Sequence, residues 1–252
     1  MSEHNTCLNC GAAVTTNYCG HCGQKAATHR FTLKHFVAHD IIHGAFHLDK
    51  GFPYTLKHLV TKPGYSIRDY IDGKRVGHFN AITFLLIVIA LNLFVQSATN
   101  YDLAKLTLVD TNATGLLEQA QHYQKAYIKQ FYLITIPLAS LIGYLVLRRS
   151  GLNFAEHLVL NTYKEGFVLL LNTMSILLLP AFDDVAGKIA IQSLFGLAAN
   201  IWTVWYFIQI FRNDYKNNLL LALFLALFFI INAIVKGTLI LGFIYFVIGF
   251  PE

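Results

Sequence analysis

All four cysteines of the chain lie in one short stretch near its N-terminus, CLNCGAAVTTNYCGHCGQK. They form two CxxC pairs, and such pairs let four thiolates converge tetrahedrally on Zn²⁺. Glycines within the pairs supply the tight turns that this geometry needs. The alternative is two disulfides or a redox pair, against which a cytoplasmic location and the doubled motif both argue. We therefore predict a structural zinc ribbon over residues 1–30, with the ligands Cys7, Cys10, Cys19 and Cys22.

A zinc ion held by four cysteines has no open coordination position, so catalysis at this metal is not expected. Ribbons of this size commonly bind protein or nucleic acid. No Lys or Arg lies between Cys7 and Cys22, and only Lys25 and Arg30 follow closely. These are too few for a strong phosphate-binding surface. The expected partner is therefore another protein, or the body of the same chain.

A second group of metal-ligand side chains follows in HFVAHDIIHGAFHLDKG, where a histidine recurs at every fourth position from His35. The pattern predicts a helix over residues 31–46, and histidines at i and i+4 can chelate a divalent ion. The alternative is an amphipathic helix at the membrane surface that uses histidine as an interfacial residue. The candidates for a second metal site are His39, His43 and His47.

The composition of the chain indicates which kind of structural elements position these residues. Of the 252 residues, 55% are hydrophobic and only 13% are charged, with a mean hydropathy of +0.49. Soluble domains carry roughly 25% charged residues. We predict an all-α polytopic membrane protein with three parts: the ribbon at 1–30, interfacial amphipathic helices at 31–78, and a transmembrane helical domain at 79–252.

Five apolar runs are long enough to be candidate transmembrane spans. No secretory leader opens the chain, and most Lys and Arg residues fall on the side of the ribbon, so we expect a cytoplasmic N-terminus and a C-terminus on the opposite side. The last run is interrupted by Lys236-Gly237, so it can be one tilted helix or two short ones. The predicted spans are 79–98, 131–147, 158–180, 189–211 and 219–249.

Between the histidines and the first span, Pro53 and Pro63-Gly64 predict two short helices, the second capped by Ser66. Basic residues then precede the membrane. They can act as a positive-inside anchor at anionic headgroups, or they can bind a phospholipid phosphate or a charged partner loop. The candidates for this binding are Arg68, Lys74 and Arg75.

The segment HLDKGFPYTLKHLVTKPGYSIRDYIDGKRVGHFN, together with NFAEHLVL at 153–160, resembles an uncharacterised family of bacterial inner-membrane proteins, catalogued as a domain of unknown function. The resemblance implies a topology and a location in the bacterial inner membrane, but no reaction. It also directs attention to Glu156-His157. These residues could complete a metal site with His43 and His47, or they could be satisfied by the basic residues around Lys74 and Arg75.

Polar residues also occur within the apolar runs. Amides there commonly form hydrogen bonds between helices. A charged Lys236 needs a partner, yet no acidic residue lies in a securely predicted span, which weakens the case for a proton-coupled transporter.

We rank three functions. The first is a non-enzymatic scaffold, assembly or partner-docking protein, able to form homo-oligomers. The second is a lipid-handling or small-solute transport protein. The third is a metal-dependent membrane enzyme that uses the histidines at the cytoplasmic face.

Overall fold

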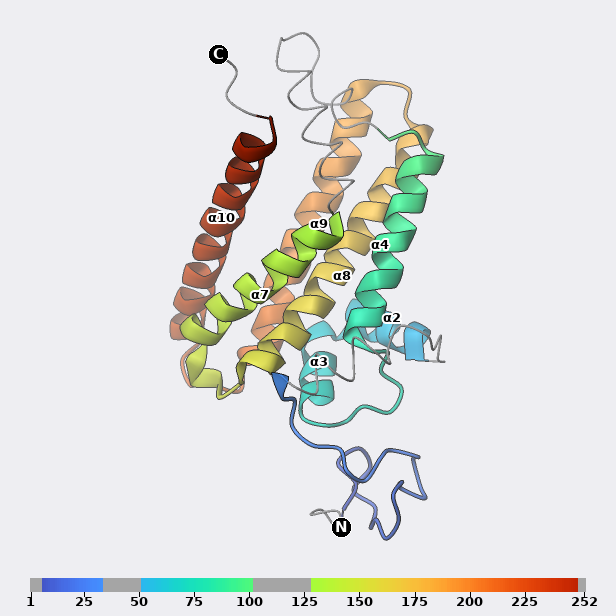
Figure 1. The fold of residues 1–252 in the computed structure, drawn as a ribbon, viewed down its shortest axis with the longest axis vertical. Helices are drawn as coiled ribbons and strands as arrows, with labels where there is room; N and C mark the ends of the chain where they lie inside the picture. Colours follow the sequence, from blue (N-terminus) through green and yellow to red (C-terminus); the bar gives the residue numbers. More distant parts are fainter. Residues whose placement is uncertain (1–5, 34–50, 102–127, 249–252) are drawn as a thin grey trace.

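The computed structural model describes residues 6–33, 51–101 and 128–248 (Figure 1). Within these ranges the chain is helical and contains no strand, apart from two isolated β-bridges in the N-terminal segment. The all-α prediction is therefore confirmed for the described residues. The helices are α2 (Gly51–Thr61), α3 (Pro63–Ile71), α4 (Ala81–Ala98), α7 (Ile128–Val146), α8 (Phe154–Leu178), α9 (Val185–Phe211) and α10 (Asn218–Ile248), with short 3-10 turns at Arg148–Ser150 and Leu179–Ala181.

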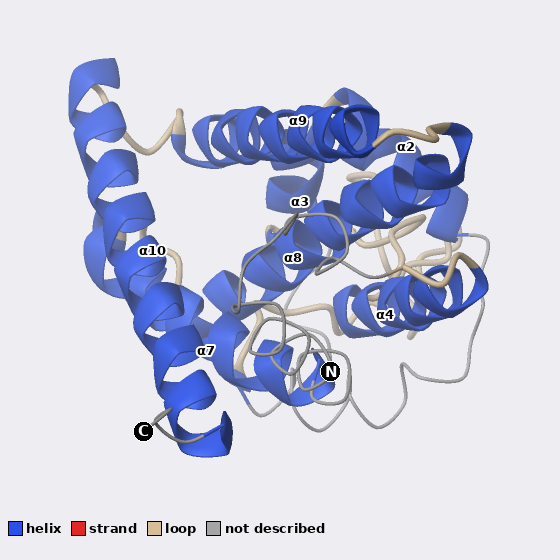
Figure 2. Ribbon diagram, turned by 90° about the horizontal axis from the view of Figure 1, so that it is seen from above, coloured by secondary structure: helices blue, strands red, loops and turns tan. Residues whose placement is uncertain are grey.

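Helix α8 is the centre of the bundle. It contacts α4, α7 and α9, while α10 packs mainly on α7 and lies at the edge (Figure 2). The large side chains of Tyr163 on α8 and of Tyr206 and Phe207 on α9 are fully buried in the core. Each tyrosine hydroxyl also donates a hydrogen bond to a carbonyl of another element: Tyr163 to Phe79, and Tyr206 to Leu160 at 2.8 Å. Burial of these rings fixes how α4 and α9 sit on α8.

Four of the helices are long and apolar enough to cross a membrane: α4, α8 with its 3-10 extension to Ala181, α9, and α10 over Asn218–Leu239. The apolar part of α7, Phe131–Val146, is shorter. The described residues thus give four candidate spans where we predicted five. Helix α10 continues through Lys236 and Gly237 without a break, so this segment is one helix and not two short ones.

The outward faces of the long helices carry exposed apolar side chains. Examples are Leu197 and Ile201 on α9, and Leu223 and Ile230 on α10. Large exposed apolar areas of this kind are costly in water and favourable against lipid. The chain is therefore a membrane protein.

Helices α2 and α3 form a corner under the bundle, and α9 completes their hydrogen bonding. Pro63 ends α2 and starts α3, since proline is favoured in the first turn of a helix. The indole of Trp202 donates to the Leu59 carbonyl of α2 at 2.8 Å. The Gln209 side chain accepts from the Gly64 N–H of α3 at 2.9 Å. The second short helix therefore starts earlier than predicted, and Gln209 rather than Ser66 caps it.

Helix α8 also starts earlier than predicted, at Phe154 instead of residue 158. Asn153 and Glu156 form a capping box: the Asn153 side chain accepts from the Glu156 N–H at 3.0 Å, and Glu156 accepts from the Asn153 N–H at 2.7 Å. Two otherwise unsatisfied donors are paired in this way, which favours helix initiation at that point.

Candidate metal centre and its attachment to the bundle

The two CxxC pairs fold into matching turns. In the first, the Cys7 N–H donates to the Ala12 carbonyl at 2.8 Å, and the Gly11 N–H donates to the Cys7 carbonyl at 2.9 Å. Cys19 and Gly23 make the equivalent bonds in the second turn. Gly11 and Gly23 both have a left-handed backbone, with φ of 75° and 76°. Only glycine adopts this conformation readily, which explains its place after each second cysteine.

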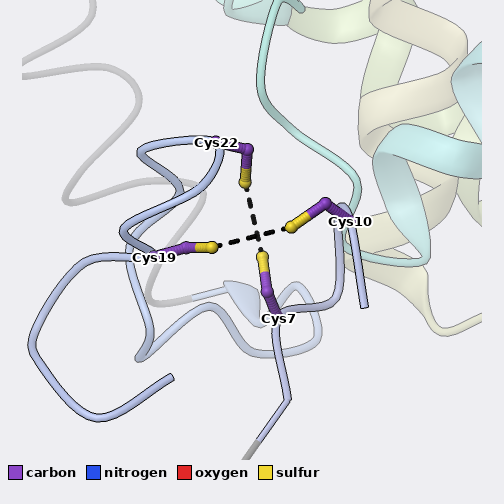
Figure 3. A group of neighbouring side chains, drawn as sticks. All are labelled: Cys7, Cys10, Cys19 and Cys22. Atoms are coloured by element: carbon purple, nitrogen blue, oxygen red, sulfur yellow. Dashed lines mark hydrogen bonds between the residues drawn. The ribbon is translucent and has the colours of Figure 1, made fainter. Parts of the chain in front are cut away.

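The turns bring the four sulfur atoms to within 4.8 Å of one another, pointing at a common centre (Figure 3). Cys7 and Cys22 are 3.5 Å apart at sulfur, and Cys10 and Cys19 are 3.6 Å apart. A tetrahedron with metal–sulfur bonds of about 2.3 Å has edges of about 3.8 Å. The four cysteines could therefore hold a metal ion. His21, inside the second turn, is exposed and lies outside this ligand set.

The backbone prepares this cluster to bind a cation. The N–H groups of Cys22 and His21 hydrogen-bond to the Cys19 sulfur and lower the pKa of its thiol from 9.0 to about 6. At Cys10 the bond from the Ala12 N–H also lowers the pKa, but desolvation and the neighbouring sulfurs outweigh it and raise the pKa to about 12. Thiolates at such short separations repel, and a bound divalent cation removes that repulsion.

Gln24 attaches the ribbon to the helical bundle. This residue directly follows the second turn, and its side chain is buried. Its amide donates to the Gly73 carbonyl at 2.9 Å and accepts from the Arg75 N–H at 3.0 Å. Both partners lie in the loop after α3. The ribbon therefore packs on the body of its own chain, one of the two partners expected from sequence.

A second attachment joins the end of the ribbon to the start of α8. The Arg30 guanidinium pairs with both carboxylate oxygens of Glu156, at 2.6 and 2.7 Å, and also donates to the Gly151 carbonyl at 2.5 Å. The Asn153 amide donates to the Phe31 carbonyl at 2.9 Å. The hydrogen bond and charge of Glu156 raise the pKa of Arg30. Glu156 is thus satisfied by Arg30, and not by the residues around Lys74 and Arg75.

The three basic residues proposed to bind lipid or a partner each contact groups of the chain itself. Arg68 lies 2.7 Å from Asp214 and 3.3 Å from Asp72, and Lys74 lies 2.7 Å from Asp69. The Arg75 guanidinium donates to the His29 carbonyl at 2.8 Å and stacks over the Phe31 ring at 3.8 Å.

The predicted second metal site falls largely outside the described residues, because His39, His43 and His47 lie between residues 34 and 50. Of the composite site, Glu156 is engaged as above. His157 is fully buried, packs against Gly143 and Phe211, and neither ring nitrogen has a hydrogen-bond partner. The histidine site stays a prediction.

One functional group was missed from sequence. Lys236 does have an acidic partner: its ammonium lies 2.7 Å from Oε1 of Glu165 on α8, and Lys164 lies 2.6 Å from the same oxygen. The expectation that no acid is available was wrong because the first part of the 158–180 run, which contains Glu165 and was not counted as a secure span, is a buried part of α8. The adjacent Lys164-Glu165 in an apolar run was the signal that could have revealed it.

Comparison with known proteins covers one part of the chain. Residues 49–93 match the family model described as a protein of unknown function (DUF3667). A DUF3667 domain is therefore present. It spans α2, α3 and most of α4, including the Pro63-Gly64 corner that α9 completes. No curated protein and no solved structure matches the chain.

Proposed function

We propose that the chain is a docking protein of the bacterial inner membrane, in which a zinc-bound ribbon forms a fixed head for a protein partner in the cytoplasm. Zn²⁺ suits the four cysteines because thiolates in a closed tetrahedral set are its usual structural ligands. The resemblance to a bacterial family and the excess of basic residues on the side of the ribbon support the membrane and its orientation. Anionic headgroups and a second copy of the chain are further expected contacts.

The observation that carries this proposal is that the ribbon is both closed and fastened. Four cysteines leave no coordination position for a reaction, and Gln24 and Arg30 attach the ribbon to the bundle. The outer side of the ribbon remains available to a partner, since Tyr18 is 59% exposed. A rigid surface is favourable for recognition because little conformational entropy is lost on binding.

The metal is tested first. Elemental analysis of the purified full chain should give one zinc per chain, and Cys7→Ser with Cys10→Ser should remove it. His21→Ala is the matched control and should keep the metal, because this side chain is not in the ligand set. A metal other than zinc, or zinc retained in the double variant, would contradict the assignment.

The docking role needs a separate experiment in intact cells. A photo-crosslinking amino acid at Tyr18 should capture the same protein partner repeatedly, and the product should disappear with Cys7→Ser and Cys10→Ser. The same amino acid at Val60, exposed on α2, is the control and should not yield that product. Capture that persists without the metal, or equal capture from both positions, would rule out docking by the ribbon.

A further inference from the structure

An ion cluster lies inside the candidate membrane spans, away from the ribbon. The ammonium nitrogens of Lys164 and Lys236 approach the same oxygen of Glu165, at 2.6 and 2.7 Å. The two nitrogens are therefore separated by no more than the sum of these distances. Two ammonium groups this close repel strongly unless negative charge lies between or beside them.

The cluster is placed within the part of the bundle that crosses the membrane. Gly166, the next residue on α8, lies against Phe84, which is in the first turn of α4. Tyr132 on α7 is close enough to Glu165 to interact electrostatically. Three helices thus enclose the site, with Lys164 and Glu165 from α8, Tyr132 from α7 and Lys236 from α10.

The charges of the cluster do not balance. Two lysines share one carboxylate, and among the described residues no other acidic side chain pairs with either lysine. An uncompensated charge within a membrane costs several kcal/mol unless it is paired or hydrated. With the described residues alone, the cluster becomes neutral in one of two ways: a lysine loses its proton, or an anion binds.

The exposure of the three side chains shows where an anion can enter. The side chains of Lys164 and Glu165 are 11% and 7% exposed, but that of Lys236 is 35% exposed. Lys236 lies on α10, a candidate span at the edge of the bundle, so the exposed part of its side chain borders the bilayer. The exposed Ile230 and Ile234 of the same helix lie on another side of it. An anion therefore reaches Lys236 from the bilayer, which favours an amphiphile over a free ion.

We propose that Lys236 and Lys164 bind the anionic headgroup, carboxylate or phosphate, of an amphipathic ligand that enters from the membrane. Glu165 holds the two lysines in position and neutralises only part of their positive charge, so the remainder is available to the ligand. The ligand stays in contact with the apolar face of α10 through its chain. This site does not depend on the ribbon, so it stands or falls separately from the docking function.

The test uses the full chain in nanodiscs of phosphatidylcholine, with three radiolabelled probes: palmitate, phosphatidylglycerol and inorganic phosphate. Saturable binding is expected for one or both amphiphiles and not for inorganic phosphate. Lys236→Gln should weaken that binding by about tenfold or more, as expected for losing a charge-assisted hydrogen bond. The variant should fold, because Lys164 and Glu165 remain as a neutral pair.

Lys188→Gln is the matched control: it makes the same substitution on α9 and should leave binding unchanged. Lys236→Arg keeps the positive charge and should retain binding even if Lys236→Gln proves unstable. The proposal is overturned if no amphiphile binds saturably, if only inorganic phosphate binds, or if folded Lys236→Gln binds as the unchanged chain does. Loss of binding in a folded Lys236→Arg also overturns it.

Discussion

At the end of the bundle that carries the ribbon, basic side chains are held by carboxylates on neighbouring elements. Arg30 pairs with Glu156 and Arg68 with Asp214. Their value depends on burial: the Glu156 side chain is 2% exposed, while that of Asp214 is 15% exposed. A carboxylate removed from water is costly to leave unpaired. Loss of either arginine would therefore be destabilising, and the unpaired carboxylate would be the more buried one at Glu156.

His78 has the environment of a pH-sensitive residue. It lies in the loop before α4, with Nε2 2.9 Å from the Ser66 hydroxyl, while Nδ1 has no hydrogen-bond partner. Burial, with a smaller contribution from the charge of nearby His58, lowers its pKa from 6.5 to about 4. The unfolded chain then binds more protons between pH 6.5 and 4, so stability falls as the pH drops through this window.

We predict that His78→Gln flattens this pH dependence. Between pH 7 and pH 5 the unchanged chain should lose about 2 kcal/mol through His78, and the variant should not lose that part. Thermal unfolding in detergent at the two pH values measures the difference. His29→Gln, at an exposed position, should behave as the unchanged chain does. Equal pH dependence in all three proteins would refute the assignment to His78.

Among the elements, α9 provides the polar groups that the α2–α3 corner lacks. A break at proline leaves the last carbonyls of one helix and the first N–H groups of the next without partners. Trp202 and Gln209 lie seven residues apart, two turns along one face of α9, and so reach both sides of the break. This pairing holds α2 and α3, which lie within the DUF3667 domain, against the bundle.

Gly64 permits the close approach of α3 to α9. A Cβ at this position would overlap the Tyr206 carbonyl oxygen and the Ile210 backbone nitrogen, neither of which can move without distorting α9. We predict that Gly64→Ala lowers the free energy of unfolding by about 1–3 kcal/mol or more. Thermal unfolding in detergent checks this value.

Gly196 is the matched control for that substitution. It also lies on α9, but a Cβ there meets nothing within 4 Å. Gly196→Ala should therefore raise stability by up to about 1 kcal/mol, because alanine has the higher helix propensity. Destabilisation of the same size at both positions would show that close packing at Gly64 is not the cause.

At the scale of the whole molecule, the ribbon and the bundle are joined by a small number of polar contacts. Figure 1 shows the ribbon at the end of the bundle where α3 and the start of α8 lie. Gln24 holds the loop after α3, and Arg30 holds the start of α8. The four-cysteine cluster is thus positioned by Gln24 and Arg30, which belong neither to the cluster nor to a candidate span.

We predict that Arg30→Met loosens this attachment without affecting the metal. It leaves the buried Glu156 carboxylate without its partner, which costs up to about 3 kcal/mol. Hydrogen exchange at residues 72–76 should become faster, while the zinc content stays the same. Lys25→Met, at an exposed position one residue after Gln24, should leave exchange unchanged. Unaltered exchange in Arg30→Met would mean that the contacts of Gln24, Arg75 and Asn153 hold the ribbon without Arg30.

Much of this organisation could be predicted from sequence because its causes are local. Long apolar runs predict membrane helices, since hydrocarbon requires the backbone to satisfy its own hydrogen bonds. Spacing within CLNCGAAVTTNYCGHCGQK predicts the cysteine cluster, because each turn is closed by residues next to its own cysteines. These features depend on contacts within a few residues.

Partner choice across the fold could not be predicted in the same way. Arg30 pairs with Glu156, Gln209 caps α3, and Lys236 pairs with Glu165. In each case the partners are more than seventy positions apart in the sequence. Such pairs depend on how helices are packed and rotated, which hydrophobic periodicity does not specify. Composition and spacing therefore determined a membrane-embedded helical protein with a four-cysteine head. Only the tertiary structure decided which charges are neutralised, because neutralisation requires atoms from distant helices to come within hydrogen-bonding distance.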